Sequence, residues 1–151
     1  MRWGHLYRVC FILGQTAEDI LQRNPRFPTM AKNLLTFFSL GPVVVPLAAF
    51  LENGALADVC VATVRNGEKV HASTVGDMTY SPTFLVSFLS QVMALHPGDF
   101  ISTGTPGAAA IEGGDVVECR IEGLPTLLSI PLASFRRARP VGLSFECIGC
   151  R

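Results

Sequence analysis

The chain has 151 residues, 49% of them hydrophobic and 16% charged, which suits one domain with a buried core and excludes a disordered segment. Its 12 lysines and arginines balance 12 aspartates and glutamates, so it lacks the net basic charge of a general nucleic-acid surface. No apolar run reaches the roughly 18 residues of a membrane span. From the balanced charge we expect no nucleic-acid partner, and from the short apolar runs we expect no membrane partner.

The five cysteines are scattered and odd in number, whereas a disulfide framework normally shows an even set. The apolar run after Arg8 is only about five residues long, which is too short for the core of a signal peptide. We therefore expect reduced thiols and a cytoplasmic protein. Cys147 and Cys150 have the spacing of a metal or redox pair, but no second pair accompanies them, and an incidental tail is the favoured interpretation.

The first third of the chain alternates short strands and helices. The β-branched and aromatic run from Tyr7 to Leu13 predicts a buried strand. A helix capped by Thr16 is expected to follow and to end near Arg23, and a further helical turn is expected within residues 29–36. Residues 43–45 predict a strand that Pro46 closes.

A hairpin and one long helix form the middle of the chain. Residues 58–65 and 68–74 predict two strands, and Asn66-Gly67 between them is typical of a type I′ turn. Apolar residues recur at helical spacing over residues 82–95, with Ser81 suited to the cap and Pro82 to the first helical position. Later strands are expected at 116–121 and 126–130. The prediction is a strand-dominated α+β domain with one prominent helix.

The stretch 95–107 contains a turn, a short strand and a loop with two threonines. Gly104 and Gly107 flank Thr105, so an anionic oxygen could approach backbone N–H groups and the Thr105 hydroxyl together. The alternative is a plain corner between two strands.

Seven short motifs occur in one order between residues 32 and 118. They are Lys32-x-x-x-Thr36, Leu40-Gly41-Pro42, Arg65-Asn66-Gly67-Glu68, Asp77-Met78, Leu95-x-Pro-Gly-Asp99, Thr103-Gly-Thr-Pro106 and Gly114-Asp115-Val-Val-Glu118. This ordered set, over roughly residues 7–132, resembles the C-terminal catalytic domain of the fumarylacetoacetate hydrolase family.

The resemblance implies a mixed β-sandwich roll, usually dimeric, so we expect a homodimer. It also implies an enzyme that uses Mg²⁺ or Mn²⁺ to hydrolyse, decarboxylate or isomerise small β-diketo or 2-oxo acids. We expect residues 1–135 to form part of such a domain and residues 136–151 to form an irregular basic, cysteine-containing tail.

The resemblance also assigns roles to four residues. Lys32 is the catalytic residue, which supplies positive charge where an enolate develops, and Thr36 supports the metal site. Thr105 and Gly104 bind the substrate carboxylate. The cation polarises the carbonyl and stabilises the enolate. Read without the resemblance, Lys32 is a solvated surface lysine.

The family's metal-binding carboxylates are missing from this pattern. The position of one aspartate falls on Gly14, and the family's Glu-x-Glu pair lies upstream of the first strand, where the chain has too few residues for it. A hard cation takes about six oxygen ligands, so we assign no metal ligand here. We expect an N-terminally truncated or divergent member. The residues leave open whether it is an active enzyme or an inactive remnant that serves as a dimer partner. An unrelated β-rich binding module is the third reading.

Overall fold

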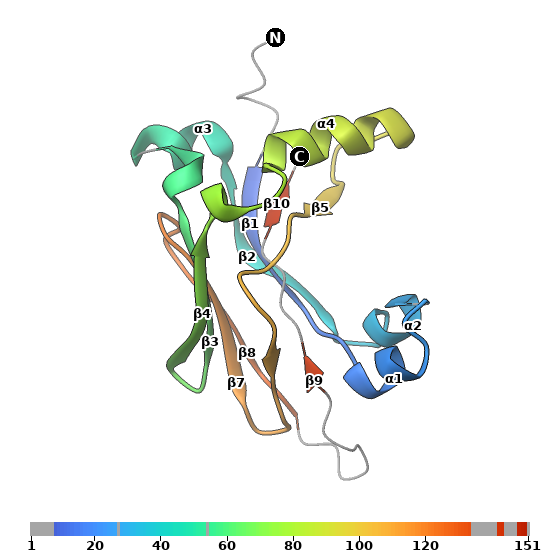
Figure 1. The fold of residues 1–151 in the computed structure, drawn as a ribbon. Coiled ribbons are helices and arrows are strands. Elements are labelled where there is room, and N and C mark those ends of the chain that lie inside the picture. The colour runs from blue at the N-terminus through green and yellow to red at the C-terminus, as the bar shows by residue number, and fades with distance from the viewer. Residues whose placement is uncertain (1–7, 27, 54, 134–141, 144–147, 151) are drawn as a thin grey trace.

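The computed structural model describes residues 8–26, 28–53, 55–133, 142–143 and 148–150 (Figure 1). Two four-stranded sheets lie face to face, and every pairing described within them is antiparallel. In order across the first sheet, the strands are β2 (Phe38–Pro46), β1 (Arg8–Gly14), β10 (Ile148–Cys150) and β5 (Phe100–Ser102). In order across the second sheet, they are β4 (Glu68–Thr74), β3 (Cys60–Arg65), β7 (Val116–Ile121) and β8 (Leu128–Pro131). The short strands β6 (Ala109–Ala110) and β9 (Gly142–Leu143) pair with each other.

The core lies between β1 and β7. Five consecutive residues of β1 are buried, as the unbroken apolar run predicts for a strand covered on both faces. Val9, Phe11 and Leu13 share one cluster with Val117 and other buried side chains. Cys10 and Ile12, which point to the other face of the strand, form a second cluster.

The short helices α1 (Glu18–Arg23) and α2 (Pro28–Lys32) lie at the lower end of β1, in contact with each other (Figure 1). The predicted cap by Thr16 is wrong, because Ala17 is the N-cap and makes no side-chain cap. The residues on either side of Thr16 are held by backbone bonds, from Gln15 N–H to the Phe37 carbonyl and from Ala17 N–H to the Ala31 carbonyl. Thr16 is therefore fixed in a buried, extended segment before the helix begins.

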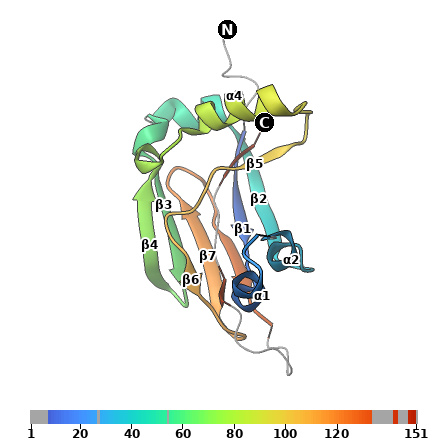
Figure 2. The same ribbon diagram turned by 45° about the vertical axis from the view of Figure 1, so that its right-hand side comes forward.

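The prominent helix is α4 (Pro82–Val92), which Figures 1 and 2 both show lying across the upper end of the molecule. Its predicted start is confirmed, since the Ser81 hydroxyl accepts a hydrogen bond from the Phe84 N–H at 3.2 Å. The helix ends three residues earlier than predicted, because Met93 is extended (φ −146°, ψ 149°). None of its residues is buried. It is too short to cross a membrane, and none of the other helices described is long and apolar enough to do so.

A shorter helix, α3 (Leu47–Phe50), follows β2, and 3₁₀ turns span Leu51–Asn53, Leu56–Asp58 and Val75–Asp77. The hairpin of β3 and β4 has the predicted turn, with φ of 52° at Asn66 and 83° at Gly67. The strand-dominated α+β fold is confirmed.

Two strands, β9 and β10, fall within the predicted irregular tail of residues 136–151. Strand β10 occupies a place between β1 and β5 that its own sequence did not indicate. Cys147 and the arginines at 136, 137 and 139 lie outside the described residues. The proposed boundary between domain and tail stays a prediction.

Candidate functional site

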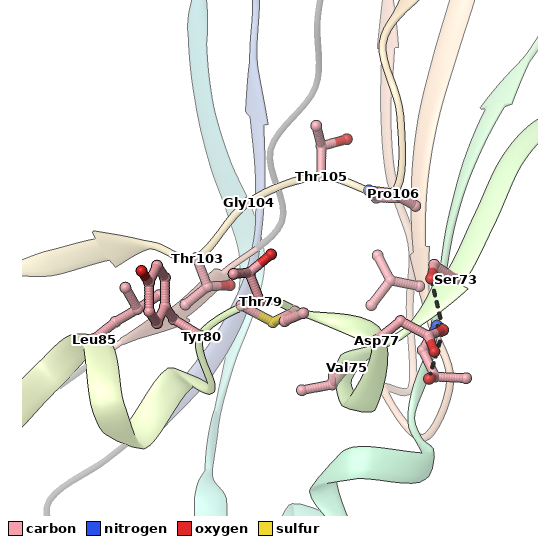
Figure 3. A pocket seen from close by; sticks show the side chains of 13 residues that line it. Ser73, Val75, Asp77, Thr79, Tyr80, Leu85, Thr103, Gly104, Thr105 and Pro106 are labelled. Carbon is pink, nitrogen blue, oxygen red and sulfur yellow. Dashed lines mark hydrogen bonds between the residues drawn. The ribbon is translucent and has the colours of Figure 1, made fainter.

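A cavity of about 400 Å³ opens beside the loop that joins β5 to β6 (Figure 3). Four parts of the chain surround it: Val61 of β3, the end of β4 with the turn that follows, the segment that leads into α4 with the start of that helix, and the loop itself. Its lining residues are Val61, Ser73, Thr74, Val75, Asp77, Met78, Thr79, Tyr80, Leu85, Thr103, Gly104, Thr105 and Pro106. Among these, Asp77 is the one charged side chain, and hydroxyl groups supply most of the remaining polarity.

The conformation of the loop from Thr103 to Gly107 depends on the glycine at 104 and on hydrogen bonds of the Thr105 hydroxyl. Gly104 has a φ of 124°, a conformation that side chains with a Cβ rarely adopt. The Thr105 hydroxyl donates to the Gly107 carbonyl at 3.1 Å, and the Gly107 N–H donates back to Thr105 Oγ1 at 3.4 Å. In Figure 3 the Thr105 side chain points away from Thr103 and Tyr80. This local turn fixes the direction of the Thr105 hydroxyl within the loop.

Asp77 organises the opposite wall. One of its oxygens accepts hydrogen bonds from the Thr74 N–H at 3.0 Å, the Thr74 hydroxyl at 2.9 Å and the Ser73 hydroxyl at 2.8 Å. The Thr74 backbone bond, followed by the two hydroxyl bonds, holds the pKa of Asp77 below its ordinary value. The carboxylate is therefore ionised at neutral pH, and Asp77 is the N3 residue of a capping box whose N-cap is Thr74, at the start of the 3₁₀ turn at 75–77. The spacing Thr74-x-x-Asp77 is a capping-box pattern that sequence reasoning missed.

Aromatic rings lead away from the cavity along α4. Tyr80 stacks on Phe84 with ring centroids 4.9 Å apart, and Phe84 stacks on Phe88 at 6.0 Å. We call these three residues and Val92 the α4 face. The four are exposed at 56, 47, 51 and 65%, respectively.

The four predicted site residues fall into two groups. Gly104 and Thr105 line the cavity, whereas Lys32 and Thr36 do not. Lys32 is the last residue of α2, and Figure 1 shows α2 beside the lower end of β1, away from the helix that begins at the cavity. Thr36 has a φ of 71°, which is a strained conformation for a β-branched residue.

The described residues do not fit the divalent cation that the resemblance implies. Gly14 ends β1 and offers no side-chain oxygen. The nearby Asp19 lies in the first turn of α1 and pairs with Arg23 at 3.6 Å. No group of three or more histidine, cysteine, aspartate or glutamate side chains that could hold a metal occurs in the part of the chain that the structure describes.

Comparison with known proteins assigns the fold to a family. Residues 9–129 match the model of the fumarylacetoacetate (FAA) hydrolase C-terminal domain. The chain is 30% identical over 133 residues to the oxaloacetate tautomerase YisK of Bacillus subtilis, covering 83% of this chain and 43% of that protein.

Two solved structures show the same fold. A 5-carboxymethyl-2-hydroxymuconate delta-isomerase from Mycobacterium smegmatis superposes with a TM-score of 0.70 at 26% identity, over 85% of this chain and 59% of that one. A fumarylpyruvate hydrolase from Pseudomonas aeruginosa, in complex with Mn²⁺ and pyruvate, has a TM-score of 0.66 at 21% identity, over 85% and 66% of the two chains.

The chain therefore belongs to the fumarylacetoacetate hydrolase family and corresponds to its C-terminal domain. It spans about half the length of the curated relatives it matches.

Proposed function

We propose that this chain supplies the substrate-binding loop of an enzyme that hydrolyses, decarboxylates or isomerises small β-diketo or 2-oxo acids. The observation that carries the proposal is the cavity beside Gly104 and Thr105, in a chain whose residues 9–129 match this family. Relatives named for oxaloacetate tautomerase and for 4-hydroxyphenylacetate degradation isomerase/decarboxylase activity support the reaction class.

The loop has the chemistry to hold a carboxylate. The Gly107 N–H donates to Thr105 Oγ1, so the Thr105 oxygen stays in place while its proton turns from the Gly107 carbonyl toward a ligand. The open backbone at Gly104, where no atom lies within 4 Å of a Cβ position, lets a ligand oxygen approach closely. Hydroxyl and N–H donors of this kind stabilise negative charge when they are fixed in advance.

The proposal also assigns Lys32 as the catalytic residue and Thr36 as the residue that supports the metal site. Lys32 would supply positive charge to the enolate, and the strained backbone of Thr36 is typical of a functional position. A divalent cation, Mg²⁺ or Mn²⁺, belongs to the proposal as the family cofactor, and the structure of the fumarylpyruvate hydrolase contains Mn²⁺. Such an ion would polarise the keto group of the substrate, and it would need ligands beyond the described residues.

The test is turnover of oxaloacetate and an acylpyruvate by the full chain with added MgCl₂ or MnCl₂. We expect Lys32→Ala to lower the rate by at least about 100-fold, as removal of a charge-stabilising group does. Lys69→Ala, on the exposed strand β4, is the matched control and should keep the full rate. A Lys32→Ala variant that turns over as fast as the wild type contradicts the role of Lys32. A wild-type chain with no turnover identifies the inactive alternative.

Metal binding is tested separately by calorimetry. Because the described residues offer no cluster of ligands, we expect Mn²⁺ titration of the chain alone to show no one-to-one binding in the micromolar range. A clear micromolar site would contradict this expectation and would place ligands in the rest of the chain.

A homodimer is the expected assembly, and the α4 face is its proposed contact surface. Residues 78–95 carry no charged side chain, so two copies of this face meet without charge repulsion. Aromatic side chains of this kind are enriched at interface cores. We expect sedimentation of the wild type to show a dimer and Phe88→Glu to give a folded monomer. A strictly monomeric wild type at high concentration contradicts the assignment.

A further inference from the structure

His71 of β4 lies directly against the loop that carries Thr105. In the register of the hairpin, His71 is opposite Thr63 and Lys69 is opposite Val64, so Val70 is the extra residue of a β-bulge. Bulges re-aim the side chains beside them. His71 Nε2 lies 2.9 Å from the carbonyl oxygen of Ala108. Because a carbonyl only accepts, Nε2 carries a proton and is the donor.

The imidazole ring also covers Gly107. A Cβ built on Gly107 would lie 2.6 Å from Cγ, 2.7 Å from Nδ1 and 2.8 Å from Cδ2 of His71. These distances are far shorter than van der Waals contact. Gly107 is not among the described glycines with positive φ. The ring above Gly107, not a positive φ, is therefore what requires glycine there.

The contact continues from Gly107 to the proposed ligand-binding hydroxyl. Both the N–H and the carbonyl of Gly107 are bonded to the Thr105 hydroxyl, so any displacement of Gly107 moves Thr105 Oγ1. Beyond Ala108, the Arg65 guanidinium donates to the Ala110 carbonyl at 2.6 Å. The β3–β4 hairpin thus holds the segment after the loop at two points.

We propose that His71 is a positioning residue, which clamps Gly107 and Ala108 and thereby sets where the Thr105 hydroxyl stands at the cavity. The identity of the ligand that the hydroxyl binds rests on the proposed function, whereas the clamp rests on the contacts of His71 with Gly107 and Ala108. In this role His71 touches no ligand and acts only through the loop.

A double-mutant cycle in the full chain tests the clamp without any ligand. We expect Gly107→Ala to lower the melting temperature by about 3 °C or more, because the new methyl group collides with the ring. In the His71→Ala background the same change should cost less than about 1 °C, since the ring is gone. Equal losses in both backgrounds would overturn the clamp. Lys69→Ala in place of His71→Ala is the control, and it should leave the loss from Gly107→Ala unchanged.

NMR spectra of the loop then test positioning. In His71→Ala we expect the Thr105 and Gly107 amide signals to shift and the Gly107 amide to exchange about fivefold faster, as for one lost hydrogen bond. His71→Gln, whose amide can donate in place of Nε2, should restore most of the exchange protection. Unchanged loop signals in His71→Ala would overturn the proposal.

Pyruvate, as a 2-oxo acid probe, separates the clamp from the proposed function. We expect wild-type titration to shift the Thr105 amide, His71→Ala to weaken pyruvate about fivefold and His71→Gln to bind within about twofold of wild type. Equal pyruvate affinity in wild type and His71→Ala would overturn the positioning role. A wild type whose loop does not respond to pyruvate counts against the proposed function, and the Gly107 exchange rates then decide the clamp.

Discussion

Strand β1 and helix α4 are both strongly apolar, yet the structure places them in opposite environments. Five of the seven residues of β1 are buried between the two sheets. Helix α4 contains no buried residue, and Phe84 and Phe88 remain about half exposed. Apolar composition alone therefore does not decide burial: β1 forms the core, whereas α4 lies exposed on the surface.

The difference shows what each element contributes. β1 stabilises the domain through the apolar surface that it removes from water. The α4 face keeps a contiguous apolar patch in solvent, and such patches mark contact surfaces in soluble proteins. Measurements at Phe11 and Phe88 can break or sharpen this contrast, and two measurements at Asp115 supply an intermediate case between them.

The largest effect is expected at Phe11, whose side chain is fully buried in the core cluster. Phe11→Ala removes the ring and leaves a cavity, so we expect it to lower the free energy of unfolding by about 3–5 kcal/mol. Urea unfolding measures the loss. A loss below about 1 kcal/mol would show that β1 is not packed as described.

An intermediate effect is expected at the tip of the β3–β4 hairpin. Asp115 Oδ1 accepts from the Asn66 side chain at 2.7 Å, and its Oδ2 accepts from the Glu112 N–H at 2.9 Å and lies 3.3 Å from Arg65 Nε. Asp115→Ala should therefore cost about 1–2 kcal/mol. Asp58→Ala, in an exposed 3₁₀ turn, is the control.

The same aspartate predicts a pH dependence of stability. The Asn66 side chain, then the Glu112 N–H and the Arg65 charge, hold the pKa of Asp115 below its ordinary value of 3.8. A carboxylate with a lowered folded pKa stabilises the protein fully above its unfolded pKa. That stability is lost as the pH falls through the lower folded pKa. Asp115→Ala should flatten this acid limb of the stability curve, and a limb of unchanged steepness would contradict the assignment.

The smallest effect on stability is expected on α4. Phe88→Ala, measured at a concentration where the protein is monomeric, should change the free energy of unfolding by about 0.5 kcal/mol. The ring is exposed and contributes mainly its stacking on Phe84. A loss as large as that of Phe11→Ala would remove the contrast between β1 and α4.

Turns and helix starts could be predicted from the sequence, because each depends on the side chains of only a few neighbouring residues. The Asn66-Gly67 turn and the Ser81-Pro82 helix start are confirmed for this reason. Other features depend on distant partners. Thr16 does not cap a helix because the backbone on either side of it is bonded to Phe37 and Ala31, and no nearby residue signals these contacts.

The candidate site was predicted only in part. Gly104 and Thr105 line the cavity, as their glycine-rich loop suggested. Asp77 had a local signal in its spacing from Thr74, but its place in the cavity wall depends on β5 and α4 meeting the end of β4. The contact of His71 with Gly107 joins residues 36 positions apart across a β-bulge, and neither the bulge nor the approach can be read from the residues alone.

The position of β10 has a consequence for how the protein is made. Residues 8–10 of β1 pair with residues 148–150, so the ribosome must synthesise well over a hundred residues before β1 gains this neighbour. Until then one edge of the most apolar strand in the core lacks its partner, and an open edge of this kind can pair with another chain. The first sheet is therefore completed only after β10 has been synthesised.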